Sequence, residues 1–288
     1  MDNHSGTSVC KTDACFDTAP PSGYQMIAGL NSNILQMLVF DPEKNKFIAF
    51  VLKSIHFKSN YLDYYKQLHH FFEESNLAQH SYKDVVVLWE TQRSTLVPDA
   101  LFDPAGQELY FQFNQGALAD EKVYSDKLKT TEAFNVYAIP SDLEKNISFK
   151  PFRIRHHASV FIESLMIFSK HSLLPKQVFI NVHHGFFDMA VAEAGRLVFY
   201  NTFGYKTAGD FIYFVLFVFG QLKLSPESDG VILSGEIVKN SALYEVLYKY
   251  VRKVDFAAPG VQYANSHILN DIPAHTVHNL VNAVLCEL

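Results

Sequence analysis

The sequence predicts an α/β fold made of two similar units, each with a mixed sheet flanked by helices. Paired apolar runs joined by turn residues indicate hairpins, and short continuous apolar runs are typical of strands that helices cover on both faces. Apolar residues at helical spacing indicate the helices. Because hairpin, further strand, helix and buried strand follow one another in both halves of the chain, we interpret the order as a loose internal duplication.

The first unit is expected to contain a hairpin, a helix and a covered strand. Its hairpin runs are apolar and partly β-branched, and a turn with Pro and Asn joins them. In the helix, Leu62 and Leu68 share the apolar positions at helical spacing with Tyr65, His69 and Phe72. The expected elements are strands at 34–40 and 47–52, a helix at 61–76 and a strand at 85–89.

The second unit repeats this order. Asp210 is a residue type that caps helices, and it directly precedes an apolar run. The expected elements are strands at 177–180, 189–192 and 196–200, a helix at 211–222, a covered strand at 231–234, a helix at 241–253 and a strand at 254–256.

The two units suggest three divisions of the chain. We expect a disordered tail at residues 1–22, a first domain at 23–150 and a second domain at 151–288. The first domain contains a less regular insertion from residue 92 onward, with one strand at 134–139. A helix at 157–174 opens the second domain, and a final helix at 275–286 is expected to pack back on the first domain.

Composition argues against two kinds of partner. The 288 residues carry a net charge of −6, which opposes general nucleic-acid binding because such binding relies on Lys and Arg. The longest apolar stretch, 211–219, is far shorter than the ~20 residues that span a bilayer. The N-terminus lacks a secretory signal, and an odd number of scattered cysteines makes a poor disulfide framework. We therefore expect a cytoplasmic protein without a membrane span.

The most informative segment is residues 181–191, Asn-Val-His-His-Gly-Phe-Phe-Asp-Met-Ala-Val. It has the length and outline of a phosphate-binding β-hairpin. A nucleotide-binding hairpin needs an acidic residue, small glycines and hydroxyls, whereas this turn carries an amide, imidazoles and phenyl rings. The segment therefore predicts an architecture more strongly than it predicts an activity.

This order of elements resembles the actin-like ATPase superfamily, which includes actin, sugar kinases and heat-shock chaperones, from about residue 31 to the C-terminus. The chain is also similar to an uncharacterised bacterial family assigned to that fold. The closer similarity rests on residues 95–98 (Thr-Leu-Val-Pro), 135–140 (Asn-Val-Tyr-Ala-Ile-Pro), 271–275 (Asp-Ile-Pro-Ala-His) and 285–288 (Leu-Cys-Glu-Leu). The resemblance implies two duplicated, ribonuclease H-like domains with an ATP site in the cleft between them.

The resemblance places degenerate nucleotide-site positions at Asn181, His183, Gly185 and Asp188. Asp188 and Gly185 match the superfamily hairpin, but Asn181 replaces its acidic residue and His183 one of its glycines. A neutral amide is a weaker ligand for Mg²⁺ than a carboxylate, and an imidazole takes space that phosphate needs. Phe186 and Phe187, at hydroxyl positions, would desolvate phosphate without donating hydrogen bonds.

Two further superfamily segments are also eroded. Residues 32–35, near the first phosphate loop, contain neither Asp nor Gly. In the adenosine-binding segment, Ser234 and Gly235 keep the start of the pattern, and Glu236 follows where more glycines would stand. These three residues complete the set of candidate positions.

Several side chains admit a functional and a structural interpretation. His183 and His184 are potential metal ligands or acid–base groups, or a packed or surface pair. His156 and His157, near Arg153 and Arg155, form a potential anion site, although packing is again the alternative. Glu236 is either a catalytic carboxylate or an acidic residue at the start of a helix.

The sequence leads to one main functional hypothesis and two alternatives. We expect a non-catalytic binding or scaffolding protein that has lost ATP hydrolysis, with a protein partner, no catalytic residue, no metal and no cofactor. The first alternative is a nucleotide-dependent enzyme with ATP and Mg²⁺. In this enzyme Asp188 or Glu236 would bind the metal, and Ser234 and Gly235 would contact the base of the nucleotide. The second is an assembly factor whose own side chains fill its cleft.

Overall fold

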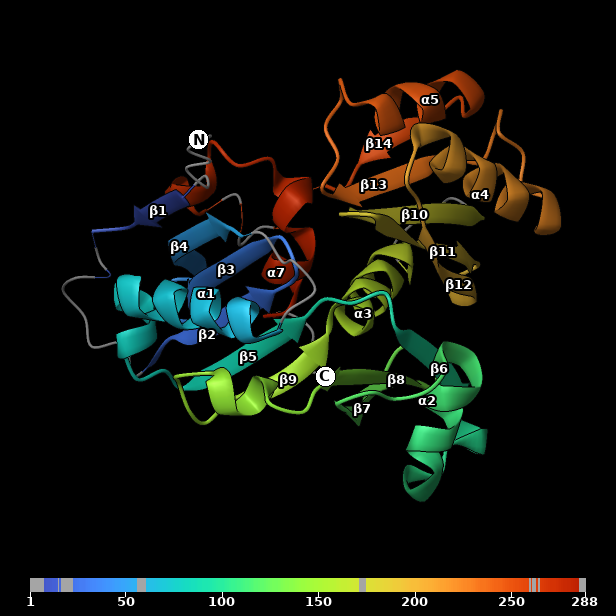
Figure 1. Cartoon of the computed structure of the whole chain (residues 1–288). Helices are drawn as coiled ribbons and strands as arrows, with labels where there is room; N and C mark the ends of the chain where they lie inside the picture. The colour runs from blue at the N-terminus through green and yellow to red at the C-terminus, as the bar shows by residue number, and fades with distance from the viewer. Residues whose placement is uncertain are drawn as a thin grey trace, which may run out of the picture.

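The computed structural model describes residues 8–14, 16, 23–55, 61–170, 175–258, 260, 263 and 265–284. These residues form two large lobes, each built on one mixed sheet, and a smaller sheet that projects from the first lobe (Figure 1). The α/β fold class with mixed sheets flanked by helices is confirmed.

The sheet of the first lobe has the strand order β1-β4-β3-β2-β5-β9. Strands β2, β3 and β4 are antiparallel neighbours, whereas β5 pairs in parallel with β2 and β9 with β5. The strands are β1 (Ser8–Thr12), β2 (Gln25–Leu30), β3 (Ile34–Asp41), β4 (Lys46–Ser54), β5 (Asp84–Trp89) and β9 (Arg153–His156).

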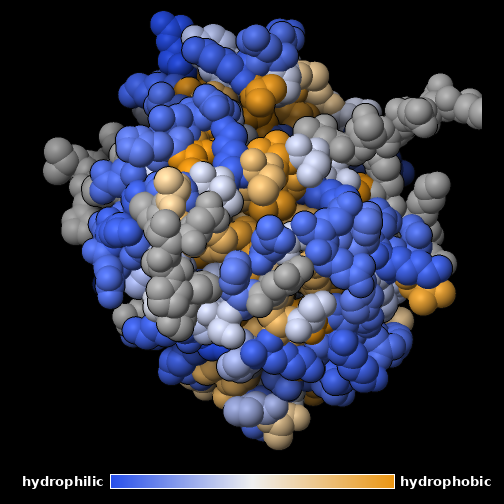
Figure 2. Space-filling view, turned by 90° about the vertical axis from the view of Figure 1, so that its left-hand side faces the viewer, coloured by the Kyte–Doolittle hydropathy of each residue, from blue (hydrophilic) through white to orange (hydrophobic). Residues whose placement is uncertain are grey.

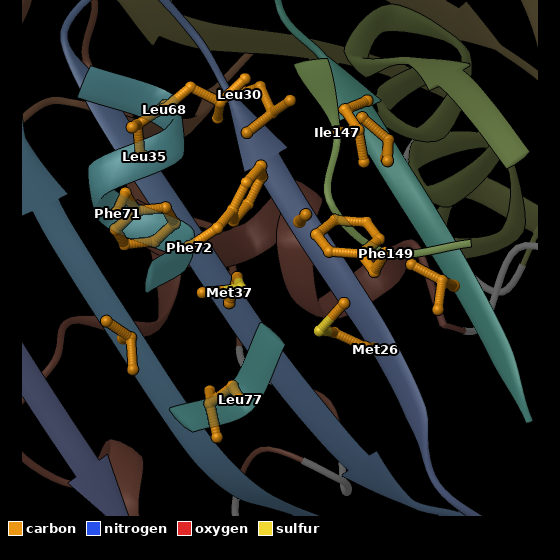
Figure 3. Close-up of a cluster of buried hydrophobic side chains, with 14 of the residues drawn as sticks. Met26, Leu30, Leu35, Met37, Leu68, Phe71, Phe72, Leu77, Ile147 and Phe149 are labelled. Carbon is orange, nitrogen blue, oxygen red and sulfur yellow. The ribbon is translucent and has the colours of Figure 1, made fainter. Parts of the chain in front are cut away.

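The two faces of this sheet bury different partners, because successive strand residues point to opposite sides. On one face, Met26 and Met37 pack beneath α1 (Tyr61–Glu74), which contributes Leu68, Phe71 and Phe72 (Figure 3). The 3-10 helices η2 (Asn76–Gln79) and η5 (Leu143–Asn146) also pack on this face, through Leu77 and Leu143.

The opposite face is covered by the C-terminal segment. Ile27, Leu38 and Phe50 form one core with Leu269 and Leu280 from that segment. Its elements are η6 (His267–Leu269), η7 (Ala274–Val277) and α7 (His278–Asn282), and residues 285–288 lie outside the described part. The last described helix therefore packs against a sheet formed early in the chain.

The second lobe repeats the topology of the first. Its order β12-β11-β10-β13-β14 corresponds to β4-β3-β2-β5-β9, with three antiparallel strands followed by two parallel ones. Helices α4 and α5 cover one face and α3 the other. The elements are α3 (His157–Lys170), β10 (Lys176–His183), β11 (Phe186–Glu193), β12 (Arg196–Gly204), α4 (Ala208–Gln221), β13 (Val231–Gly235), α5 (Ala242–Tyr250) and β14 (Val254–Phe256).

The region after residue 92 is more regular than the sequence predicts. It forms an antiparallel sheet in the order β6-β8-β7, and α2 buries Phe111 against Val136 and Val97 on this sheet. The elements are β6 (Ser94–Pro98), η3 (Asp99–Leu101), η4 (Pro104–Gly106), α2 (Gln107–Gln115), β7 (Glu121–Leu128) and β8 (Ala133–Pro140). The charged strand β7 was missed because its outward residues hide the period-2 pattern.

Three sequence-based boundaries are wrong. Ser8–Thr12, assigned to a disordered tail, pairs with β4 as an edge strand. Arg153–His156, placed in the second domain, pairs with β5, so the chain leaves the first sheet after His156. The α4 N-cap is Thr207, whose hydroxyl accepts from the Asp210 backbone N–H while the Asp210 carboxylate caps the Thr207 N–H in return.

The surface offers no membrane-spanning helix within the described ranges, since none of their helices combines sufficient length with sufficient apolar character. Figure 2 views the first lobe from its outer side and shows mostly hydrophilic groups, with hydrophobic groups exposed near the middle.

The packing of α1 yields a test that compares two leucines on one helix. Leu68 is fully buried, whereas Leu62, expected from the sequence to share its face, is 64% exposed. We expect Leu68→Ala to lower the free energy of unfolding by about 2–5 kcal/mol and Leu62→Ala to change it by less than about 0.5 kcal/mol. Chemical denaturation checks both values, and equal losses would contradict this packing.

Candidate functional site

The candidate site lies where hairpin β10–β11 of the second lobe meets the end of β5 in the first lobe. Asp188 is buried at its centre. Its Oδ2 atom lies 2.9 Å from Nε2 of both His157 and His183. Its Oδ1 atom accepts hydrogen bonds from the hydroxyls of Tyr200 and Thr202, each at 2.9 Å. The carboxylate thus has polar neighbours on both oxygens.

His183 connects this carboxylate to the first lobe. Its Nδ1 atom lies 2.9 Å from Oε1 of Glu90, the residue directly after β5. The Asn31 amide, after β2, donates to the same Glu90 oxygen at 2.9 Å. A chain of polar contacts therefore runs from the first-lobe loop through Glu90 and His183 to Asp188.

Interactions between charged groups outweigh burial in setting the pKa values of this polar network. Burial would lower the pKa of His183, but the Glu90 and Asp188 carboxylates raise it to about 10. Burial would raise the pKa of Asp188, but His157 and His183 hold it well below its usual range. The pKa of Glu90 is also lowered, since His183 and Asn31 offset its burial. The cluster is therefore an ion pair network.

Asn181 lies beside Asp188 and Ser234 because of strand register. It pairs with Asp188 across the β10–β11 ladder and with Ser234 across the parallel β10–β13 ladder. Ser234 donates to Asn181 Oδ1 at 2.9 Å, and Asn181 Nδ2 lies 2.7 Å from His183 Nε2. The structure thus brings together four of the residues singled out in the sequence.

The turn of the hairpin disperses the remaining bulky residues. Phe186 stacks on His183 with ring centroids 4.3 Å apart. Phe187 points to the other face of the sheet, where it packs on Phe211, and His184 is exposed. The expectation that Phe187 would face a phosphate is therefore wrong, because alternate strand residues face opposite sides. His184 and Phe186 line a cavity of about 250 Å³ between the lobes, together with Ser32 and Glu90.

The first-lobe loop after β2 is closed by its own side chain. Oδ1 of Asn31 accepts from the backbone N–H groups of Asn33 at 2.8 Å and Ile34 at 2.6 Å. These are the donors that a loop of this kind could offer to an anion. Here they are already satisfied.

Gly235 and Glu236 form the second-lobe wall of a small cavity between the lobes. The cavity measures about 60 Å³ and is also lined by Asn31, Glu90 and His183. Gly235 has φ +84°, and a Cβ atom there would lie 2.1 Å from the Val182 carbonyl oxygen. Burial of its carboxyl group, followed by repulsion from Glu90, raises the pKa of Glu236 to about 7.

The proposed anion site near His156 does not form as expected. Arg153 pairs with Asp84, at 2.6 Å, and Arg155 with the buried Asp126, at 3.2 Å. Asp126 also accepts from the His156 backbone N–H and the Ser159 hydroxyl. Asp126 thus attaches the small sheet to the start of α3, and the contacts of these residues give them a structural role.

Sequence analysis missed Glu90, Asn31, Tyr200 and Thr202, and it did not connect His157 with Asp188. One signal was present for Glu90. It follows a continuous apolar strand, and side chains at the carboxyl ends of parallel strands gather at the sites of α/β proteins. The other residues reach the site through β12 and through the crossing between the lobes, which no local pattern reveals.

Comparisons with known proteins agree with this architecture. A structure from Bacteroides thetaiotaomicron, described as a protein with actin-like ATPase fold and unknown function, matches with a TM-score of 0.79 and 23% identity over 93% of this chain and 97% of that one. PilM from a PilM–PilN type IV pilus biogenesis complex matches with a TM-score of 0.60 and 12% identity over 91% of this chain and 97% of that one. A search of curated proteins gave no significant match.

The protein therefore has the actin-like ATPase fold, as the sequence resemblance implied. Residues 13–254 match the family described as "Protein of unknown function (DUF3822)", and the chain belongs to that family.

The close approach of Val182 to Gly235 predicts that an alanine at this position lowers stability, and Gly185 offers a matched control. Gly185 has a similar φ, +79°, but no atom lies within 4 Å of its virtual Cβ. Gly185→Ala should cost only the backbone strain of about 1–3 kcal/mol, whereas Gly235→Ala should cost clearly more because it also displaces the Val182 carbonyl. Denaturant titration measures both, and equal costs would refute the close approach.

The raised pKa of Glu236 predicts a pH-dependent stability. A carboxyl group with a raised pKa binds its proton more tightly in the folded state, so its contribution weakens as pH rises from about 4.5, its unfolded pKa, to about 7. Glu236→Gln should therefore leave the melting temperature nearly unchanged at pH 4.5 and raise it at pH 8. A difference that is constant across this range would contradict the shift.

Proposed function

We propose that this protein is a non-catalytic binding or scaffolding protein that has lost ATP hydrolysis. One observation carries the proposal: the protein's own side chains already contact the groups that a nucleotide would need. Asn31 caps the N–H groups of the first loop, and His183 and Phe186 stack at the second.

The metal and size requirements of a nucleotide support the same proposal. Asn181 offers an amide where the superfamily hairpin has an acidic residue, and its amide is engaged by Ser234 and lies against His183. The described residues line two inter-lobe cavities, of about 60 Å³ and about 250 Å³, and both are smaller than typical ligand pockets, which measure about 300–1,000 Å³. The residues present therefore do not fit Mg-ATP.

A protein partner is the binding function that the surface supports best. Tyr213 and Phe217 on α4 are 63% and 50% exposed and stack on each other. Exposed aromatic side chains are enriched in protein interfaces. The similar PilM fold was solved within a protein complex, which is in line with a binding role for this frame.

A nucleotide-dependent enzyme is the second candidate, and Glu236 favours it. Its pKa of about 7 suits a general acid or base, and it lines the inter-lobe cavity together with Glu90. In this alternative Glu236 would act on a ligand for which the lobes must first move apart.

Calorimetric titration with Mg-ATP, together with a phosphate-release assay, separates the two candidates. We expect no binding heat at micromolar concentrations and no phosphate release above the buffer rate. Micromolar binding with steady release that Glu236→Gln abolishes would establish the enzyme and end the scaffolding proposal. Release that persists at the same rate in Glu236→Gln would point to a contaminating ATPase.

A further inference from the structure

Four buried side chains converge between the lobes. His157 Nε2 and His183 Nε2 each lie 2.9 Å from Asp188 Oδ2. The Asn181 amide nitrogen lies 2.7 Å from His183 Nε2 and 3.5 Å from Asp188 Oδ2. The ligand atoms of the two histidines and Asp188 lie within 4.8 Å of one another.

In the amide orientation of the structure, the Asn181 amino group and Asp188 Oδ2 make opposite demands on His183 Nε2. A proton on His183 Nε2 suits Asp188 but faces the Asn181 amino group, so that two donors meet. Without that proton, lone pairs of His183 and Asp188 face each other across 2.9 Å. If the amide is turned, its oxygen accepts from His183 Nε2 and lies 3.5 Å from Asp188 Oδ2.

We propose that this cluster is a binding site for one divalent transition-metal ion, and that zinc is the ion it suits best. A cation at the centre would accept lone pairs from all four side chains, with Asn181 turned to present its oxygen. Tetrahedral zinc with bonds of about 2.0–2.2 Å separates neighbouring ligand atoms by about 3.3–3.6 Å, so the contacts of 2.7 and 2.9 Å would lengthen by about 0.4–0.9 Å.

The donor set selects the kind of ion. Two imidazoles suit zinc and its first-row neighbours, whereas Mg²⁺ prefers oxygen ligands and keeps several waters. The site therefore differs in chemistry from a Mg-nucleotide site, and it departs from the expectation of no metal. Four protein ligands leave no open position, which is typical of a structural zinc site.

The surrounding contacts resemble the outer ligand shell of zinc proteins. Glu90 accepts from His183 Nδ1 at 2.9 Å, an arrangement that orients the imidazole for a metal on Nε2. Tyr200 and Thr202 hold the other oxygen of Asp188. The carboxylates of Asp188 and Glu90 together balance the charge of a divalent ion.

A metal here would fasten the start of α3 to the hairpin of the second lobe. His157 is the first residue of α3, directly after the last strand of the first sheet, and the other three ligands belong to hairpin β10–β11. Glu90, at the end of β5, adds a contact from the first lobe to His183. Zinc would therefore fix the crossing from the first sheet into the second lobe, whether or not a nucleotide binds.

Metal content and metal-dependent stability of the full chain test this proposal. We expect about one zinc per chain by elemental analysis after expression with zinc. Chelator-treated protein should regain a higher melting temperature with added ZnSO₄, and Co²⁺ in its place should give the visible absorption of a tetrahedral site. Chelator-treated wild-type protein that neither binds nor is stabilised by micromolar zinc would overturn the site.

Variants separate this site from adventitious binding. His157→Gln and Asn181→Ala should weaken zinc binding at least tenfold, and Glu90→Gln should weaken it about 10–100-fold through the outer shell. His184→Ala removes an exposed imidazole from the same hairpin and should bind like wild type. Binding that is lost in His184→Ala but kept in His157→Gln would contradict the proposal. Circular dichroism verifies that each variant folds. Where a variant does not fold, the cobalt spectrum of the wild-type protein decides the question.

Discussion

The crossing from the first sheet into the second lobe depends on the buried carboxylate of Asp188. A charge in that position is costly unless donors surround it, and its donors come from separated parts of the chain. His157 follows the first sheet, His183 belongs to the same hairpin, and Tyr200 and Thr202 stand on the next strand. The fold must therefore bring α3, β10 and β12 together before this charge is satisfied.

The repeated sheet order explains why these groups meet. Both lobes place a two-strand turn, after β2 and after β10, at the carboxyl ends of their parallel strands. In the first lobe Asn31 closes this turn with its own amide, and in the second Phe186 stacks on His183. Both lobes keep the hairpin turns of the actin-like fold, while the polar groups of these turns are directed to each other.

Two views of the cluster remain compatible with one geometry. As an ion pair network it holds the lobes by charge, with His183 protonated between Glu90 and Asp188. With a metal, the protons on Nε2 would be released and the same atoms would bind the cation. Both make the region a joint of the fold, in line with the binding or scaffolding role that we propose.

Local patterns were sufficient for much of the fold. Residues 34–40, 85–89 and 231–234 are apolar except for Gln36 and Ser234, and the structure places strands there because burial on both faces demands such runs. The eroded hairpin at Asn181 was also evident, since missing glycines and carboxylates are visible without coordinates. The strand β7 was not, because charged residues occupy its exposed side.

Local sequence patterns identified many of the strands and helices, and they showed that residues 181–191 lack the acidic residue and the hydroxyls that a nucleotide would need. The tertiary structure alone placed Phe187 in the core and His183 beside Asp188, because adjacent strand residues separate according to register. It also decided that Glu90 and His157 join Asp188. Their proximity arises from the packing of two sheets and a crossing helix, and such long-range contacts leave no periodic trace in the chain.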